Sequence, residues 1–356
     1  MLREVLIRRK VFLILAVLLC ISNGCASKNI SYGKAHSDKS HKIKIGLSLA
    51  TLQEERWQRD RDIFVAKAKE LGADVIVQTA NNSSEEQLKQ VRYLLDQKID
   101  ILLIVPHDAV KAQAAVSMAK KEGIKVIAYD RLVKNANVDL YISFDNVKVG
   151  ETMTEEILKC KPNGNYVIIN GGKTDNNSYM FNKGFKNVLN PYIQVGAVNI
   201  VNEIWTEDWR PEDAYNAVDK TIKSGIKLDA VIAANDSLAG AAIEALSEQR
   251  LAGKVEVAGH DADISGCQRV AEGTQRVTIY KPIDKIAEKA AQLSVNMVKG
   301  QGVVANSTIN DGKYDVPYYM LEPVTITREN LKQTVIKDGF HRLEDVFRNV
   351  PKSEWP

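Results

Sequence analysis

The 356-residue sequence has only four cysteines, few aromatic residues and a single long apolar run. The cysteines form no CxxC pair, so a zinc or redox motif has no support. The apolar run, Val11–Ile21, spans 11 residues, whereas a membrane-spanning helix needs about 20. GxSxG and HExxH are both missing, and no GxGxxG follows an expected strand. We therefore expect a protein that is not an enzyme and that holds neither a cofactor nor a metal.

The charge of the chain is nearly balanced, with 48 basic and 45 acidic residues and a formal net charge of +3. The first 24 residues contain four basic residues and one acidic residue, so the whole net charge lies in that segment. A nucleic-acid-binding protein needs a basic face that displaces counterions. The neutral body therefore indicates no nucleic-acid partner.

The N-terminal segment is typical of an export signal. Basic residues precede the apolar run, and Gly24-Cys25 then resembles a bacterial lipobox, in which the cysteine is diacylated. We predict a signal peptide over residues 1–24, lipidation at Cys25 and a polar, flexible tether over 25–41 that anchors the protein to the outer side of the cell membrane. A plain signal peptide and an uncleaved anchor remain as alternatives.

The body of the chain shows repeated short apolar stretches separated by helical patterns. Ile101–Val105 and Tyr166–Asn170, for example, are apolar at nearly every position, which is typical of strands buried on both faces. The alternation of strand and helix predicts an α/β protein with doubly wound parallel sheets. About ten strands would overfill one small sheet, so we expect two lobes that divide near residue 147.

Polar and aromatic side chains follow many of these strands. Ligands of such sheets bind beyond the carboxyl ends of the strands, where these residues would gather. The candidates include Arg56, Trp57, Asp130, Arg131, Asp175, Asn177, Trp209, Asn235, Asp261 and Lys281. Carboxylates accept hydrogen bonds, Arg and Lys donate them, and indole rings cover C–H faces, which together suit a neutral sugar.

Each candidate also has an ordinary structural interpretation. An Asp or Asn after a strand is often a helix N-cap, and a single Trp is often part of the core. We expect Asp236 and Asp263 to be caps rather than ligands. The argument for a sugar site therefore depends on the whole set.

Several motifs resemble the D-xylose-binding proteins of bacterial ABC sugar importers, within the type I periplasmic-binding-protein superfamily. The resemblance runs from about Lys42 to Gly339. Its most specific motifs are ERW (55–57), YDR (129–131), DNN (175–177) and YKP (280–282). A departure is His260, where the family is expected to have Gln before Asp261.

The resemblance implies the fold, the site and the partners. It implies two lobes joined by three hinge strands that close over the sugar, namely 42–147 plus 283–313 and 148–282 plus 314–345, followed by a tail over 346–356. It implies that D-xylose is bound by the ten candidates named above. The protein would then present D-xylose to an ABC permease, or alternatively report it to a membrane sensor kinase of a two-component system.

Overall fold

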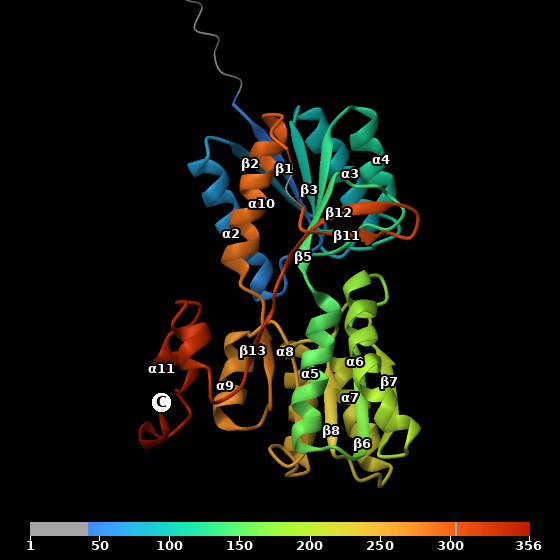
Figure 1. The fold of residues 1–356 in the computed structure, drawn as a ribbon, viewed down its shortest axis with the longest axis vertical. Coiled ribbons are helices and arrows are strands. Elements are labelled where there is room, and N and C mark those ends of the chain that lie inside the picture. The colour runs from blue at the N-terminus through green and yellow to red at the C-terminus, as the bar shows by residue number, and fades with distance from the viewer. Residues whose placement is uncertain (1–41, 303–304) are drawn as a thin grey trace, which may run out of the picture. The chain divides into compact units, whose positions relative to one another are not determined.

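The computed structural model describes residues 42–302 and 305–356. The predicted signal peptide, Cys25 and the tether lie outside the described residues. Residues 42–356 form one unit that contains two α/β lobes (Figure 1). Across the described part of the chain, no helix combines the length and the apolar character that a membrane crossing would need.

The first lobe is built on a seven-stranded sheet in the order β11-β12-β5-β4-β3-β1-β2. All neighbouring strands are parallel except β11 and β12, which form an antiparallel pair. The strands are β1 (Lys44–Leu49), β2 (Asp74–Thr79), β3 (Ile101–Ile104), β4 (Lys125–Tyr129), β5 (Leu140–Phe144), β11 (Ser307–Asn310) and β12 (Asp315–Leu321). The helices are α2 (Glu55–Glu70), α3 (Ser84–Asp96), α4 (Gln113–Lys121) and α10 (Ile283–Val298).

Strand β3 explains why this sheet is covered on both faces. All four of its residues are buried, and alternate side chains point to opposite faces. Ile101 and Leu103 pack in the cluster that contains α2 and α10, whereas Leu102 and Ile104 pack in the cluster that contains α3 and α4. Figure 1 shows these two helix pairs on the two sides of the sheet.

The second lobe contains a four-stranded parallel sheet in the order β7-β6-β8-β9 and an antiparallel pair, β10 and β13. The strands are β6 (Gly164–Asn170), β7 (Val198–Trp205), β8 (Ala230–Ala233), β9 (Glu256–Ala258), β10 (Thr278–Tyr280) and β13 (Val324–Ile326). The helices are α5 (Asn146–Cys160), α6 (Asn176–Gln194), α7 (Pro211–Lys223), α8 (Asp236–Glu248) and α9 (Ile264–Glu272). The predicted fold class, two doubly wound α/β lobes, is confirmed.

Two glycines set the position of α6, whose first turns carry predicted site residues. A Cβ on Gly150 of α5 would lie 2.2 Å from the carbonyl oxygen of Phe181 in α6. A Cβ on Gly184 of α6 would lie 2.2 Å from the carbonyl oxygen of Val147 in α5. Both distances are far below contact, so only glycine lets the two helices pack this closely.

The chain crosses between the lobes three times, after β5, after β10 and after β12. Two crossings are tied together, because the backbone N–H of Asp145 donates to the carbonyl oxygen of Leu321 over 3.0 Å. The last crossing differs from the prediction, which assigned residues 314–345 to the second lobe. Strand β12 instead pairs in parallel with β5 in the first sheet, so the chain changes lobe between Leu321 and Val324.

The predicted tail over 346–356 contains buried residues that pack on the second lobe. The C-terminal segment contains η1 (Lys332–Ile336), α11 (Leu343–Val346) and η2 (Lys352–Glu354), and its buried residues pack against α9 and β10 of the second lobe. Phe347 is only 1% exposed within this cluster. The indole N–H of Trp355 donates to the carbonyl oxygen of Val350 over 2.9 Å.

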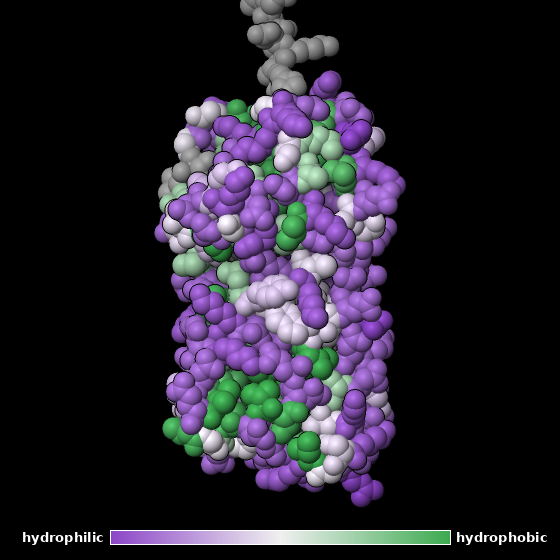
Figure 2. All heavy atoms as spheres, turned by 90° about the vertical axis from the view of Figure 1, so that its right-hand side faces the viewer, coloured by the Kyte–Doolittle hydropathy of each residue, from purple (hydrophilic) through white to green (hydrophobic). Residues whose placement is uncertain are grey.

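One face of the protein is mainly hydrophilic, with the largest apolar patch of that view in its lower half (Figure 2). In Figure 1 the edge strand β7 lies on that side of the second lobe. The second sheet is therefore less completely covered at this edge than at its centre, in agreement with the half-buried residues of β7.

Candidate functional site

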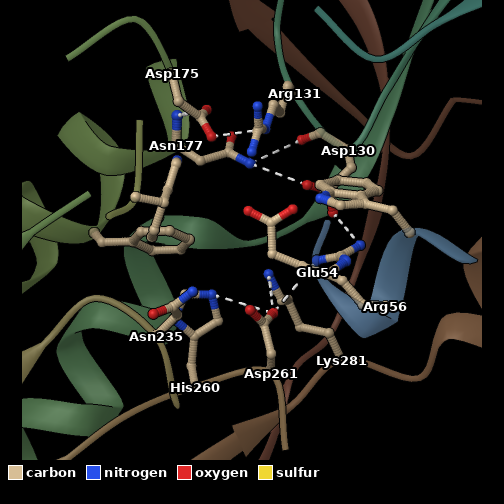
Figure 3. Close-up of a pocket in the computed structure, with 13 residues that line it drawn as sticks. Glu54, Arg56, Asp130, Arg131, Asp175, Asn177, Asn235, His260, Asp261 and Lys281 are labelled. Atoms are coloured by element: carbon tan, nitrogen blue, oxygen red, sulfur yellow. Dashed lines mark hydrogen bonds and ion pairs between the residues drawn. The ribbon is translucent and has the colours of Figure 1, made fainter. Parts of the chain in front are cut away.

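All ten predicted site residues line one cavity between the two lobes (Figure 3). Three further residues complete its wall, namely Glu54, Phe181 and His260. The free space is about 30 Å³, which is room for about two water molecules. The cavity is therefore small in this conformation, and side chains of the two lobes contact each other around it.

The first lobe contributes residues that follow β1 and β4. Arg56 and Trp57 lie in the first turn of α2, directly after the loop that leaves β1. Asp130 follows β4 with a φ of 60°, in the left-handed region that non-glycine residues rarely adopt. Its carbonyl oxygen accepts hydrogen bonds from the hydroxyls of Tyr141 and Ser143, at 2.9 and 2.7 Å, which hold this conformation.

The second lobe contributes residues from five of its connections. Asp175 is the N-cap of α6 and Asn235 is the N-cap of α8. Trp209 precedes α7 with a φ of 63°, and Asp261 follows β9 with a φ of 95°. Together with Asp130, three site residues have left-handed backbones, a local strain that is often found at functional sites.

Hydrogen bonds and ion pairs join the two lobes across the cavity. Arg56 Nη1 lies 3.4 Å from Asp261 Oδ1, and Arg131 Nε lies 2.7 Å from Asp175 Oδ2. Asn177 Nδ2 donates to the carbonyl oxygen and to Oδ1 of Asp130, at 3.1 and 3.2 Å. Several polar groups of one lobe thus find their partners on the other lobe (Figure 3).

Within each lobe, further ion pairs hold the same groups in place. Arg56 Nη2 lies 2.9 Å from Asp130 Oδ2, and Arg56 Nε lies 3.3 Å from Asp60 Oδ2. Asp60 also accepts a hydrogen bond from the hydroxyl of Tyr129. Lys281 Nζ lies 2.9 Å from Asp261 Oδ1. Arg56 and Asp261 are therefore held by two or more oppositely charged groups each.

For the carboxyl groups of Asp261 and Asp130, burial raises the pKa and the neighbouring cations lower it. Burial would raise the pKa of Asp261, but the cations Lys281 and Arg56 beside it outweigh burial, and the pKa lies well below its usual value. Burial likewise opposes the ionised form of Asp130, but Arg56 and Lys281 bring its pKa below the usual value. Both carboxylates are therefore ionised at neutral pH and accept hydrogen bonds only.

His260 is a neutral member of the wall. Burial lowers the pKa of His260 to about 3, although Asp261 opposes that shift. Its Nε2 lies 3.3 Å from Asp261 Oδ1, and its ring packs 4.5 Å from that of Phe181. Its Nδ1 is buried without a hydrogen-bond partner. His260, which departs from the expected family pattern, thus forms part of the wall of the cavity.

Aromatic rings supply flat apolar surfaces between the charged groups. The Trp57 ring stacks beneath two cations, with the guanidinium carbons of Arg56 and Arg131 at 4.3 and 5.3 Å from its centroid. Such cation–π contacts hold the two guanidinium groups in fixed orientations. Lys281 Nζ lies 5.6 Å from the ring centroid of Phe181, on the second lobe.

The position of Trp209 depends on a glycine in the loop after β6. A Cβ on Gly171 would lie 2.4 Å from the Trp209 ring and 2.5 Å from Ser178 Oγ. Trp209 Nε1 is buried and has no hydrogen-bond partner. The ring therefore fits the wall only because residue 171 lacks a side chain, and it keeps a donor that a ligand could use.

The predictions for three acidic or amide residues need comment. Asn235 does cap α8, because its Oδ1 accepts from the backbone N–H of Leu238 over 2.9 Å, and its amide nitrogen remains free to donate into the cavity. Asp236 and Asp263 were expected to be caps rather than ligands, and neither lines the cavity. Asp263 occupies the N-cap position of α9, but neither side chain makes a capping hydrogen bond to its helix. Asp236 instead accepts from Gln275, Thr278 and the backbone N–H of Asp263 inside the second lobe.

Glu54, Phe181 and His260 were not among the predicted site residues. Glu54 comes directly before α2, so the rule that selects residues after a strand could have included it. Phe181 lies four residues after Asn177, on the same face of α6. No group of three or more His, Cys, Asp and Glu side chains within residues 42–302 and 305–356 is arranged to hold a metal ion.

A cavity between two α/β lobes, with polar and aromatic side chains from both, is the arrangement by which two-lobed proteins bind small solutes. The sequence matches the periplasmic binding protein domain family over residues 45–302, so the chain belongs to that family. It is 45% identical over 312 residues to a D-xylose-binding periplasmic protein of Haemophilus influenzae, covering 87% of this chain and 94% of that one. It is 44% identical over 319 residues to the D-xylose-binding periplasmic protein of Escherichia coli, covering 89% and 96%.

The fold also matches solved structures of sugar-bound proteins. A carbohydrate transporter solute binding protein from Chloroflexus aurantiacus, in complex with D-glucose, has a TM-score of 0.81 and 27% identity, covering 85% of this chain and 97% of that one. An ABC transporter solute binding protein from Clostridium phytofermentans, with bound β-D-glucose, has a TM-score of 0.79 and 29% identity, covering 85% and 99%. The resemblance to D-xylose-binding proteins, predicted from the motifs, is confirmed.

Proposed function

We propose that this protein works outside the cytoplasm, captures D-xylose between its two lobes and presents it to an ABC importer. The observation that carries this proposal is the convergence of ten side chains, from both lobes, on one cavity. The 44–45% identity to D-xylose-binding periplasmic proteins supports the choice of sugar. The likeness to an ABC transporter solute binding protein supports the choice of partner.

The chemistry of the cavity suits a neutral sugar. Four carboxylates and three cationic side chains line it, and His260 is neutral, so its formal charge at neutral pH is −1. A negative site disfavours anionic ligands, whereas sugar hydroxyls can donate to the carboxylates and accept from Arg56, Arg131 and Lys281. Hydrogen bonds to charged groups contribute about 1.5–3 kcal/mol each.

Sugar capture requires the lobes to move. The two lobes contact each other across the cavity in this conformation, so they separate to admit the sugar. The bound sugar then takes over partners that the lobes offer each other here, such as Arg56 with Asp261 and Asn177 with Asp130. Closure over the sugar creates the surface that a membrane partner recognises.

Calorimetric titration of the purified protein with D-xylose, D-ribose, L-arabinose and D-glucose tests the ligand. We expect the tightest binding for D-xylose, together with a smaller radius of gyration in X-ray scattering when D-xylose is present. A clear preference for D-ribose, or no compaction with any bound sugar, would contradict the proposal.

We propose that Cys25 is the lipid attachment site and that residues 25–41 tether the body to the cell membrane. Changing Cys25 to Ala should release the protein from the membrane fraction into the soluble extracytoplasmic fraction. Copurification from cells grown on D-xylose tests the partner, and a permease with its ATPase is expected. Recovery of a sensor kinase without a permease would contradict the proposed role in import. It would favour a role in signalling instead.

A further inference from the structure

Glu54 is a carboxylate that the site does not pair. It lines the cavity, and Figure 3 shows its carboxylate projecting into the space between Arg131 and Asp261. The other three carboxylates of the wall each have a cation within 3.4 Å. The described residues offer Glu54 no ion pair, and its Oε2 is buried without a hydrogen-bond partner.

Helix capping does not account for Glu54. It is the N-cap residue of α2, but its side chain accepts no hydrogen bond from the first turn of that helix. At the equivalent position of α3, the hydroxyl of Ser83 does accept from the backbone N–H of Glu86 over 3.2 Å. A buried carboxylate oxygen without a partner is costly, so it is retained where a ligand supplies the missing donors.

Glu54 also lies between the inner cavity and a larger open cleft. That outer cleft has a volume of about 720 Å³, and it shares Glu54, Trp209 and Asn235 with the inner cavity. These three residues form the partition through which a ligand would pass from the cleft to the site. The partition contains an unpaired acceptor, Glu54 Oε2, and an unpaired donor, Trp209 Nε1.

We propose that Glu54 is a specificity-determining residue that contacts the bound sugar directly and accepts hydrogen bonds from its hydroxyl groups. The inference rests on the proposed function and adds a contact outside the motifs that carry the family resemblance. Glu54 supplies an acceptor at the partition, whereas Arg56 and Lys281 are donors that both contact Asp261 Oδ1 deeper in the site. A sugar that has a hydroxyl beside Glu54 can donate a hydrogen bond to its carboxylate, whereas a sugar with only hydrogen at that position cannot. Glu54 would therefore favour the first sugar over the second.

The test is D-xylose titration of Glu54→Gln, with Glu55→Gln as the matched control. Gln keeps the size of Glu54 but removes the charge, so D-xylose affinity should fall about ten- to hundredfold. Glu55 is an exposed neighbour that lines the outer cleft but not the inner cavity, so its variant should bind like the wild type. Equal affinity of Glu54→Gln and the wild type would overturn the inference.

A series of D-xylose analogues that each lack one hydroxyl distinguishes direct contact from a structural effect. The analogue that lacks the contacted hydroxyl should bind the wild type and Glu54→Gln with similar affinity, while the other analogues still lose affinity in the variant. An equal loss for every analogue would show that Glu54 acts only through the structure and would refute the contact. Failure of the wild type to bind D-xylose at all would refute the proposed function, a distinct result.

Discussion

Arg131 of the first lobe and Asp175 of the second form an ion pair, with Nε 2.7 Å from Oδ2 and both side chains less than a tenth exposed. Burial raises the pKa of Asp175, and Arg131 opposes that shift. The carboxyl group of Asp175 therefore has its positively charged partner on the opposite lobe. Its two members come from segments that are more than 40 residues apart in the chain.

Replacing Arg131 by Ala should weaken D-xylose binding by about 2–5 kcal/mol, because Asp175 would be left buried without its cation. Calorimetric titration measures the loss. Arg328→Ala is the control, since Arg328 forms an exposed ion pair with Glu354 away from the cavity and should not affect binding. Wild-type affinity in Arg131→Ala would remove Arg131 from the site.

Gly171→Ala should reduce D-xylose affinity without preventing folding. The added Cβ would collide with the Trp209 ring at 2.4 Å, so the ring must move out of the wall of the cavity. Gly172→Ala provides the matched control, because its Cβ would meet the nearest atom at 3.4 Å. Titration of both variants checks the expectation, and equal affinities would show that Trp209 does not shape the ligand site.

Acidification should destabilise the wild type more than the His260→Gln variant. The pKa of His260 is about 3 in the folded protein, because of burial, and about 6.5 in the unfolded chain. The unfolded state therefore binds an extra proton below about pH 6.5, and stability falls as the pH drops toward 3. Between pH 7 and pH 4.5 the wild type should lose about 2 kcal/mol more of its free energy of unfolding than the variant.

Urea unfolding at the two pH values measures this difference. The same measurement on His107→Gln gives a comparison outside the cavity. His107 is half-buried, and burial lowers its pKa as well. An equal loss of stability in the wild type and His260→Gln would show that folding does not lower the pKa of His260.

Phe347→Ala should lower the free energy of unfolding by about 3–5 kcal/mol, because its ring is almost fully buried in the cluster formed with α9 and β10. Chemical unfolding followed by tryptophan fluorescence measures the loss. Tyr93→Ala, at an exposed position, should have little effect. A similar small effect of Phe347→Ala would mean that the last residues pack only loosely.

The strand-end rule selected ten residues that line one cavity, but it did not locate the last crossing between the lobes. The ten site residues follow strands, and the carboxyl ends of parallel strands meet at one edge of each sheet, so a local rule sufficed to bring them together. The last crossing could not be located in this way. Whether Asp315–Leu321 pairs with β5 or with a strand of the second lobe depends on contacts between segments about 170 residues apart.

The residues that were missed show what local patterns leave out. Glu54 directly precedes the ERW motif, and nothing in its type distinguishes it from a surface residue. His260 was noted as a departure from the family pattern before Asp261, but it was not selected as a site residue. Phe181 resembles any apolar residue on the inner face of a helix. Only the packing of α6 against α5, through Gly150 and Gly184, brings this ring to the cavity.

The threading of the chain has a consequence for biosynthesis. Strand β12 completes the sheet that β1 begins, so the first lobe cannot be finished until nearly the whole polypeptide has been made. The four central strands of the second lobe, by contrast, come from one uninterrupted stretch of about 100 residues, Gly164–Ala258. The half of the molecule that starts first is therefore assembled last.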